Sequence, residues 1–279
     1  MTLVHFLKHL LRRHGPLFQF LISLGAPLQC RKFVKKHWRY PKKVAIAAFK
    51  RYPRPDYYLL KRSPKISISE SHLGVKLVDQ TSLYQPNFEV RKNSEPYLAL
   101  LNVIEKFLLE NDIRTILEIG CSSGNFLNLV KLKFPEIQVS GIEGHEFFKD
   151  ACPVEIRADI SILDLREPHR NERKFDLVIC LEVGEHIDGN CMEIFIDNIA
   201  SYCGRYLLMS WSRSFPPKDA PPQHISPMYR WQFRRLMQRW NFKILQRETR
   251  ELIKISHNEK KFKFWWRESM TLFEMESKS

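Results

Sequence analysis

Short apolar runs alternate with amphipathic stretches over most of the chain beyond residue 95. The run "FDLVICL" at 175–181 is apolar almost without interruption, as expected of a strand buried on both faces of a sheet. The stretches between such runs place apolar side chains at helical spacing. Alternating strands and helices are typical of a parallel sheet covered on both faces. We therefore predict an α/β fold for this part of the chain.

The pattern also gives approximate bounds for each element. The predicted strands are 115–120, 138–143, 154–158, 175–181, 205–211 and 242–247, with a last strand near 269–273. The predicted helices are 96–110, 124–134, 146–150, 192–202 and 229–240, with a short helix near 251. Residues 61–74 are polar and contain a proline, which predicts a linker.

The first quarter of the chain has a different pattern. Leucines recur there at helical spacing with basic residues between them, at Leu3, Leu7, Leu10 and Leu11. Residues 1–65 hold 16 Lys and Arg and one acid, Asp56, a net charge of +15, so the other residues carry −1 of the total of +14. We predict a basic, partly helical N-terminal extension and linker over residues 1–75, followed by one domain over 76–279.

Three interpretations of the basic extension stay open. It is a solvated face whose aromatic side chains pack on the neighbouring domain, a patch that contacts a membrane surface, or a nucleic-acid-binding segment. Its apolar stretch, Leu17–Leu24, is shorter than the roughly 20 apolar residues of a membrane span. No small-residue cleavage site follows it, so we expect neither a spanning helix nor a signal peptide.

The six cysteines are scattered and lack the spacing of a zinc site. Several lie in apolar runs, where a thiol behaves as a small hydrophobic group. We expect reduced thiols and a cytoplasmic protein, with a peripheral position at a membrane surface as the alternative.

One predicted strand ends on an acid and a glycine loop, in "ILEIGCSSGNF" at 116–126. Gly120 and Gly124 allow the backbone to turn sharply and to approach a ligand closely. The helix that follows offers free N–H groups at its N-terminus. In sheets of this kind, ligands bind at the carboxyl ends of the strands. The spacing G-x-x-x-G is neither the dinucleotide fingerprint nor a P-loop.

Acids also lie at the ends of the next two predicted strands. Glu143 ends the second strand, where one carboxylate can accept hydrogen bonds from both hydroxyls of a ribose. Asp159 follows the predicted third strand and could accept from an adenine amino group, with Ile160 packing on the ring. Acids at three successive strand ends, Glu118 included, favour a ligand site over a purely structural turn.

At this point the sequence resembles the class I S-adenosylmethionine-dependent methyltransferases, over roughly residues 97–275. "LEIGCSSG" is similar to their first motif, "GIEG" to their ribose acid, "ADI" to their adenine contact and "FDLVICLEVGEHI" to the fourth-strand motif of the small-molecule branch. Ser122 stands where that family most often has a second glycine.

The resemblance implies S-adenosyl-L-methionine as the cofactor and a Rossmann-like, seven-stranded, mostly parallel sheet with an antiparallel last strand. "ESMTLFEM" is the candidate for that last strand. The implied cofactor-binding residues are Glu118, Gly120, Cys121, Ser122, Gly124, Glu143, Asp159, Ile160 and Glu182.

Methyl transfer mainly requires that the nucleophile, the methyl group and the sulfur be held in line, and an oxygen nucleophile also benefits from a base. His224, in the Pro-rich segment "PPKDAPPQHISP", is the preferred base because an imidazole exchanges protons near neutral pH. Glu185 and His186 are further catalytic candidates. They also fit a structural hydrogen-bonded pair at a helix start, as Glu182 fits loop ordering and Trp211 fits core packing.

A second resemblance concerns a metal. Glu182, Glu185, His186 and His224 resemble the E-x-x-E-H and distant histidine that bind a divalent ion in small-RNA 3′-end 2′-O-methyltransferases. Two acids and two imidazoles suit Mg²⁺ or Mn²⁺. The same pentapeptide is common in metal-free relatives, so the preferred prediction contains no metal.

The preferred prediction is a methyltransferase that acts on a small, glycan-linked or lipid-linked acceptor. An RNA methyltransferase, with or without metal assistance, is one alternative. A non-catalytic binding module that keeps the fold is another, although the intact glycine loop and Glu143 argue against it. The acceptor, the methylated atom and the oligomeric state stay open.

Overall fold

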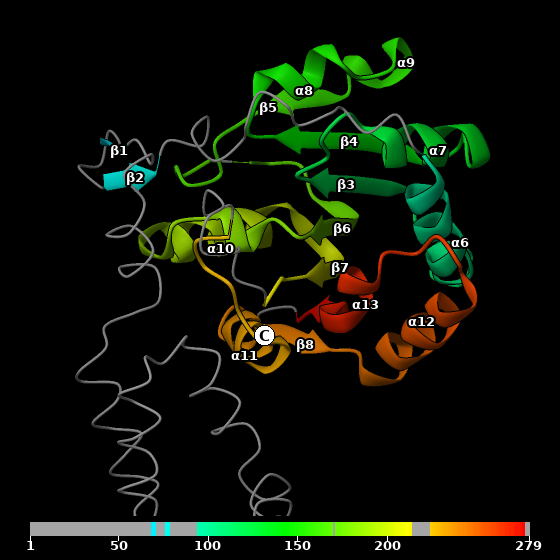
Figure 1. Cartoon of the computed structure of the whole chain (residues 1–279). Helices are drawn as coiled ribbons and strands as arrows, with labels where there is room; N and C mark the ends of the chain where they lie inside the picture. Colours follow the sequence, from blue (N-terminus) through cyan, green and yellow to red (C-terminus); the bar gives the residue numbers. More distant parts are fainter. Residues whose placement is uncertain (1–67, 71–75, 79–93, 170, 214–223, 277–279) are drawn as a thin grey trace, which may run out of the picture. The chain divides into compact units, whose positions relative to one another are not determined.

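The computed structural model describes residues 68–70, 76–78, 94–169, 171–213 and 224–276 (Figure 1). Its strands are β1 Ile68–Glu70, β2 Lys76–Val78, β3 Thr115–Ile119, β4 Gln138–Glu143, β5 Ile160–Ile162, β6 Phe175–Leu181, β7 Cys203–Ser210, β8 Phe242–Ile244 and β9 Thr271–Met275. Its helices are α6 Glu95–Glu110, α7 Asn125–Lys133, α8 Glu146–Asp150, α9 Val154–Arg157, α10 Met192–Tyr202, α11 Arg230–Gln238, α12 Gln246–Asn258 and α13 Phe264–Ser269, with the 3₁₀ turns η1 Gly184–His186 and η2 Gly189–Cys191.

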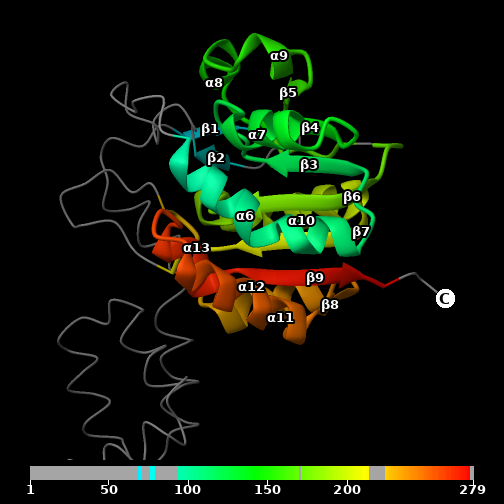
Figure 2. The same ribbon diagram turned by 90° about the vertical axis from the view of Figure 1, so that its right-hand side faces the viewer.

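Seven strands form one sheet in the order β5-β4-β3-β6-β7-β9-β8 (Figure 2). The strands from β5 to β7 pair in parallel, and β9 pairs antiparallel with both β7 and β8. The predicted Rossmann-like sheet with an antiparallel last strand is therefore confirmed. Because β3 and β6 lie side by side, the loops that follow them meet at one edge of the sheet.

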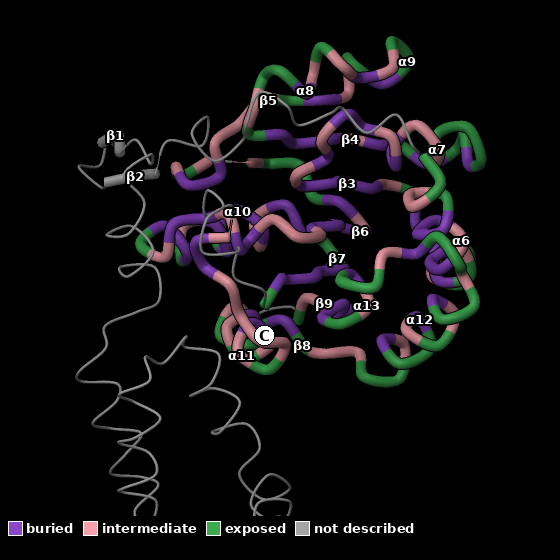
Figure 3. The backbone as a smooth tube through the Cα atoms, in the orientation of Figure 1, coloured by how far each residue is buried: buried purple, intermediate pink, exposed green. Residues whose placement is uncertain are grey.

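Helices cover both faces of the sheet. Buried side chains of α6, α7, α12 and α13 share one apolar cluster with one face, and α10 and α11 share a second cluster with the other face. Figure 2 shows α6 and α12 in front of the strands, with α10 behind them. Figure 3 shows the strands as mostly buried. Adjacent residues of β3, Ile116 and Leu117, belong to opposite clusters, which explains the continuous apolar runs.

The predicted strand at 154–158 is wrong. Those residues form the short helix α9, which follows Pro153 and buries only Ile156, while Val154 is 75% exposed. The strand beside β4 is instead β5, in which Ile160 pairs with Gly141. The β-branched composition of the segment favoured a strand, but a single buried side chain per turn is what a short surface helix provides.

Two other predicted bounds also change. The strand predicted at 242–247 ends at Ile244, and α12 begins at Gln246 and replaces the predicted short helix. Helix α13 was not predicted. The predicted linker contains β1, whose Ile68 pairs with Val78 of β2 in an antiparallel hairpin.

The basic amphipathic helix predicted near the N-terminus lies outside the described residues, and the division at residue 75 stays a prediction. Within the described residues no helix is both long and apolar enough to cross a membrane. The five cysteines in that part of the chain are buried, free thiols: Cys121, Cys152, Cys180, Cys191 and Cys203.

Candidate functional site

The loop between β3 and α7 needs its two glycines. Gly120 and Gly124 have φ angles of 71° and 67°, which L-residues rarely adopt. A Cβ atom on Gly120 would lie 2.4 Å from Cγ2 of Val183, and one on Gly124 would lie 2.3 Å from Cδ1 of Ile156. The loop is thus packed tightly against its neighbours, and its backbone forms the surface that a ligand would meet at the carboxyl end of β3.

Ser122 connects this loop to the acid at the end of β4. Its N–H donates to Oε2 of Glu143 at 2.8 Å, and its φ of 50° is left-handed although it is not glycine. Oε1 of Glu143 accepts from the N–H groups of Gly144 at 2.9 Å and His145 at 3.3 Å. Burial raises the pKa of Glu143, and these three hydrogen bonds oppose the rise. Glu143 therefore fixes the loop and still offers Oε2 lone pairs to a ligand.

Glu118, inside β3, is a buried acid with an orphaned oxygen. Its Oε2 has no hydrogen-bond partner within the described part of the chain. Burial raises its pKa well above the usual value, and the negative charge of Glu143 adds to the rise, whereas Lys263 opposes it. An orphaned buried carboxyl oxygen is costly unless a donor or a cation reaches it. Glu118 thus marks a place where a ligand cation would be stabilised.

The predicted adenine contact does not have the predicted placement. Asp159 precedes β5 instead of following a strand, and its carboxylate forms an ion pair with Lys131 at 3.0 Å. Ile160 is fully buried and faces Gly124 and Gly141 from the core. The error follows from the wrongly predicted strand, because the acid was placed at the opposite end of the true one.

Another acid lies beyond the carboxyl end of β5. Asp164 pairs with Arg166 at 2.7 Å, and Arg166 also pairs with the buried Asp188 at 3.0 Å. This ion-pair group ties the loop after β5 to the region after β6.

Cys121, a predicted cofactor-binding residue, is buried in the core, with 2% of its surface exposed.

Glu182 follows β6 in a left-handed conformation, with φ of 58°. Its Oε1 accepts a hydrogen bond of 2.7 Å from the hydroxyl of Ser210 at the end of β7. Burial raises the pKa of Glu182 to about 7, while the Ser210 bond lowers it. Backbone strain and a raised carboxyl pKa at a strand end are typical of functional sites.

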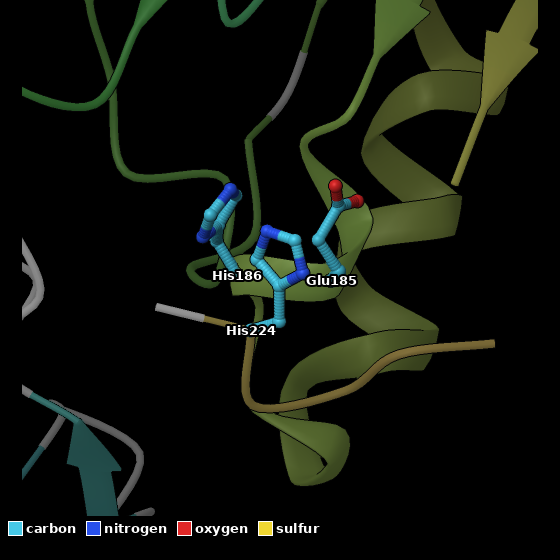
Figure 4. A group of neighbouring side chains, drawn as sticks. All are labelled: Glu185, His186 and His224. Atoms are coloured by element: carbon cyan, nitrogen blue, oxygen red, sulfur yellow. The ribbon is translucent and has the colours of Figure 1, made fainter. Parts of the chain in front are cut away.

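Three predicted catalytic residues come together beyond β6 (Figure 4). Glu185, His186 and His224 each offer a ligand atom, and these atoms all lie within 4.8 Å of one another. The rings of His186 and His224 meet edge to face, with their centroids 5.0 Å apart. Glu185 is completely buried beside the two rings. The group can bind a proton or a divalent cation.

Backbone hydrogen bonds bring His224 to this place. The carbonyl of Glu185 accepts from the N–H groups of Ile225 at 2.7 Å and Ser226 at 2.8 Å. Trp211 supports the same segment, because its Nε1 donates to the Ser226 carbonyl at 2.8 Å. Trp211 is fully buried and stacks on Phe233, so it packs in the core.

Burial raises the pKa of Glu185 well above its usual value, and the negative charge of Glu182 contributes the next largest effect. Two carboxyl groups this close favour a state in which they hold a proton between them. The buried Glu185 carboxyl beside the two imidazoles therefore holds a proton unless a cation is bound there.

Sequence reasoning missed two residues near these acids. Ser210 was read only as part of a strand, and Lys263 lies in a segment for which no element was predicted. Nζ of Lys263 lies 4.3 Å from the centroid of the Trp266 ring and 5.1 Å from that of Tyr97. Its charge lowers the pKa of both Glu118 and Glu182. The one signal in the sequence was a lysine directly before an aromatic run, "KFWW".

The chain matches the family described as a methyltransferase domain over residues 90–247, which is more than half of its length. It belongs to this family, and it is an S-adenosyl-L-methionine-dependent methyltransferase. No curated protein matches it.

Several solved structures are similar in part. One is an S-adenosylmethionine-dependent methyltransferase from Clostridium acetobutylicum, at 16% identity and a TM-score of 0.36, with 42% of this chain and 51% of that chain covered. The plantazolicin methyltransferase BpumL in complex with SAH has 14% identity and a TM-score of 0.49, with 71% and 94% covered. A SAM-dependent methyltransferase from Aquifex aeolicus has 16% identity and a TM-score of 0.42, with 58% and 90% covered. This chain thus spans about half the length of the Clostridium protein.

The cofactor, S-adenosyl-L-methionine, supplies an electrophilic methyl group on a positively charged sulfur when it is bound. The residues of the glycine loop fit it. Glu118 offers an orphaned buried oxygen for a cation, and Glu143 offers a carboxylate at the position suited to ribose hydroxyls. Gly120 supplies the left-handed turn of this loop, and its missing Cβ leaves room for Val183.

Proposed function

We propose that this protein methylates a small, glycan-linked or lipid-linked acceptor, with His224 as the general base. The observation that carries the proposal is the packing of His224 against His186 beside the buried Glu185, at the sheet edge that also holds the glycine loop. A base at this edge faces the region where the nucleophile has to lie.

The residues around His224 have distinct parts in this proposal. The Glu185 carbonyl holds the backbone at Ile225, which keeps the main chain that carries His224 at the sheet edge. His186 contacts its ring from the side. The ligand atom of the buried Glu185 carboxyl lies within 4.8 Å of those of both imidazoles, so this carboxyl is within reach of the proton that His224 takes from the acceptor.

The basic extension over residues 1–75 completes the proposal, although it lies almost entirely outside the described residues. Its net positive charge suits a membrane surface or a lipid-linked acceptor. We propose a cytoplasmic protein that contacts such a surface peripherally.

The test is methyl transfer from S-adenosyl-L-methionine with a tritiated methyl group into extracts of the cells that make the protein. The extract is divided into polar small molecules, lipids and RNA. We expect label in the first two fractions, lost in His224→Gln and kept in His257→Gln, because His257 is exposed on α12. Label in RNA alone contradicts the proposed acceptor, and full activity of His224→Gln contradicts the proposed base.

A second candidate function is favoured by the spacing of Glu185, His186 and His224. A carboxylate and two imidazoles within 4.8 Å of one another can hold a divalent ion such as Mn²⁺. Such an ion would draw in two hydroxyls of a ribose, and the basic extension would contact the phosphates of an RNA. The second candidate is therefore metal-assisted methylation of RNA.

Loss of the free Mn²⁺ signal in electron paramagnetic resonance tests this candidate. If RNA methylation is metal-assisted, the wild type and His257→Ala take up Mn²⁺ and His186→Ala does not. The protein then also binds RNA, and this binding weakens steeply as salt is added. Absence of Mn²⁺ uptake by the wild type rejects it.

A further inference from the structure

Three arginines gather beside the site, on α11 and in the segment after β7. Arg230 is the first residue of α11, Arg234 lies one turn further, and Arg213 follows β7. Nη2 of Arg230 donates to the Arg267 carbonyl of α13 at 2.9 Å, and Nε of Arg234 donates to the Thr271 hydroxyl at 2.9 Å. The two α11 guanidinium groups are thus held between α11, α13 and the start of β9.

The positive charges of these three arginines are only partly neutralised by neighbouring acids. Nε of Arg230 is buried and has no hydrogen-bond partner among the described residues. Within that part of the chain, no acid forms an ion pair with Arg230 or Arg234, and Glu268 is paired with Arg213 at 3.3 Å. Burial, together with the charge of Arg230, lowers the pKa of Arg234 to about 10. Two half-buried cations with one orphaned donor are costly unless an anion joins them.

Arg230 belongs to the same segment of the chain as the proposed base. One short connection carries both His224 and Arg230, so their Cα atoms are at most about 20 Å apart along the chain. Within it, the N–H of Met228 donates to the Ser212 carbonyl at 3.0 Å, which keeps the connection against the end of β7. The charge of Glu268 raises the pKa of Glu182 and also that of Arg230, so Glu268 lies within electrostatic reach of both.

We propose that Arg230, Arg234 and Arg213 bind an oxyanion of the acceptor, a phosphate or a carboxylate, beside the proposed base His224. This inference rests on the proposed function and names the class of acceptor, which is anionic. Guanidinium groups suit it because their planar donors pair with two oxygens of a phosphate or carboxylate at once. Displacement of Glu268 from Arg213 by the ligand would add a third cation.

The test uses the full chain labelled with ¹⁵N-arginine, and follows the Nε–H resonances by nuclear magnetic resonance. The resonance that disappears in Arg230→Lys is assigned to Arg230. Inorganic phosphate, methyl phosphate and acetate are added separately. We expect the Arg230 resonance to shift and saturate with one of them below about 100 mM, while that of exposed Arg235 on the same helix stays in place. Tighter binding of the two phosphates than of acetate identifies the oxyanion as a phosphate, and tighter binding of acetate identifies it as a carboxylate.

Two variants test the assignment, and both keep the basic extension unchanged. Arg213→Gln alters an exposed residue and should weaken oxyanion binding by about tenfold, whereas Arg235→Gln should change it by less than about twofold. Equal losses in both variants, or no shift of the Arg230 resonance with any of the three anions, overturn the inference.

S-adenosyl-L-methionine binding, measured in the same samples, separates this inference from the proposed function. We expect Arg230→Lys and Arg213→Gln to bind the cofactor as the wild type does. Cofactor binding without an oxyanion response overturns the oxyanion site alone. Oxyanion binding together with transfer of label only to RNA overturns the proposed acceptor class and leaves the oxyanion site standing.

Discussion

The carbonyl of Glu185 accepts a hydrogen bond of 2.7 Å from the N–H of Ile225, and this bond sets the position of His224. The 3₁₀ turn after β6 and the segment before α11 are far apart in the sequence, and the bond joins them by backbone alone. The site therefore depends on how two loops dock at the carboxyl edge of the sheet, as well as on the identity of the side chains there.

Ser122→Gly should stabilise the protein. Ser122 has a φ of 50°, which costs an L-residue energy that glycine does not lose. We expect the free energy of unfolding by urea to rise by about 0.5–1 kcal/mol. Ser123→Gly is the matched control, because Ser123 is buried, its Oγ accepts from Asn125, and its φ is not positive, so it should destabilise. Stabilisation by both would point to a general glycine effect.

Gly120→Ala should destabilise the protein by about 2–4 kcal/mol, from backbone strain and from overlap with Val183. Adding Val183→Ala removes the overlap but not the strain. The double variant should therefore be more stable than the sum of the single effects by about 1–2 kcal/mol. Urea unfolding of the four proteins measures this coupling, and strict additivity would show that the contact does not matter.

Glu182 should make stability depend on pH. Its pKa rises from 4.5 to about 7 on folding, so the folded state holds a proton that the unfolded chain releases. The contribution of Glu182 to the free energy of unfolding is fully present below pH 4.5 and is lost as the pH rises to about 7. Glu182→Gln should flatten the decline in unfolding free energy between about pH 5 and pH 7. The control Glu136→Gln, at an exposed position, should retain the wild-type decline; an unchanged slope in Glu182→Gln contradicts the raised pKa.

Asp159→Asn should leave cofactor binding intact, although the family resemblance implied an adenine contact. Its carboxylate pairs with Lys131 on the surface, and a surface ion pair contributes at most about 1 kcal/mol to stability. We expect the dissociation constant for S-adenosyl-L-methionine to change by less than about twofold. Cofactor binding weakened by about tenfold would instead support a contact between Asp159 and the adenine.

The parts of the fold that sequence predicted well are those with many buried positions. β6 and α10 have the predicted bounds because their buried apolar side chains recur regularly, and β4 also has the predicted bounds. The segment from Val154 to Ile162 failed because α9 and β5 are too short for a period to show. The prediction that Asp159 follows a strand and contacts adenine was wrong in its placement for the same reason.

The site was predictable to the extent that it lies at strand ends. Glu118, Glu143 and Glu182 follow from the position of β3, β4 and β6 alone. Only the family resemblance grouped His186 with His224, because backbone hydrogen bonds between loops bring the two together. Lys263 was missed because no motif marks it, and its charge acts on Glu118 and Glu182 from the last third of the chain. Arg230 was predicted only as part of a helix.

Calorimetric titration with S-adenosyl-L-methionine tests the central claim most directly, with wild type and Glu143→Gln compared. Glu143 accepts three backbone hydrogen bonds and is the predicted ribose contact, and the variant keeps its size and loses its charge. Loss of a charge-assisted hydrogen bond of about 1.5–3 kcal/mol predicts binding weakened by about tenfold or more. Folded wild type that does not bind the cofactor at about millimolar concentration, or a variant that binds it equally well, would contradict the account.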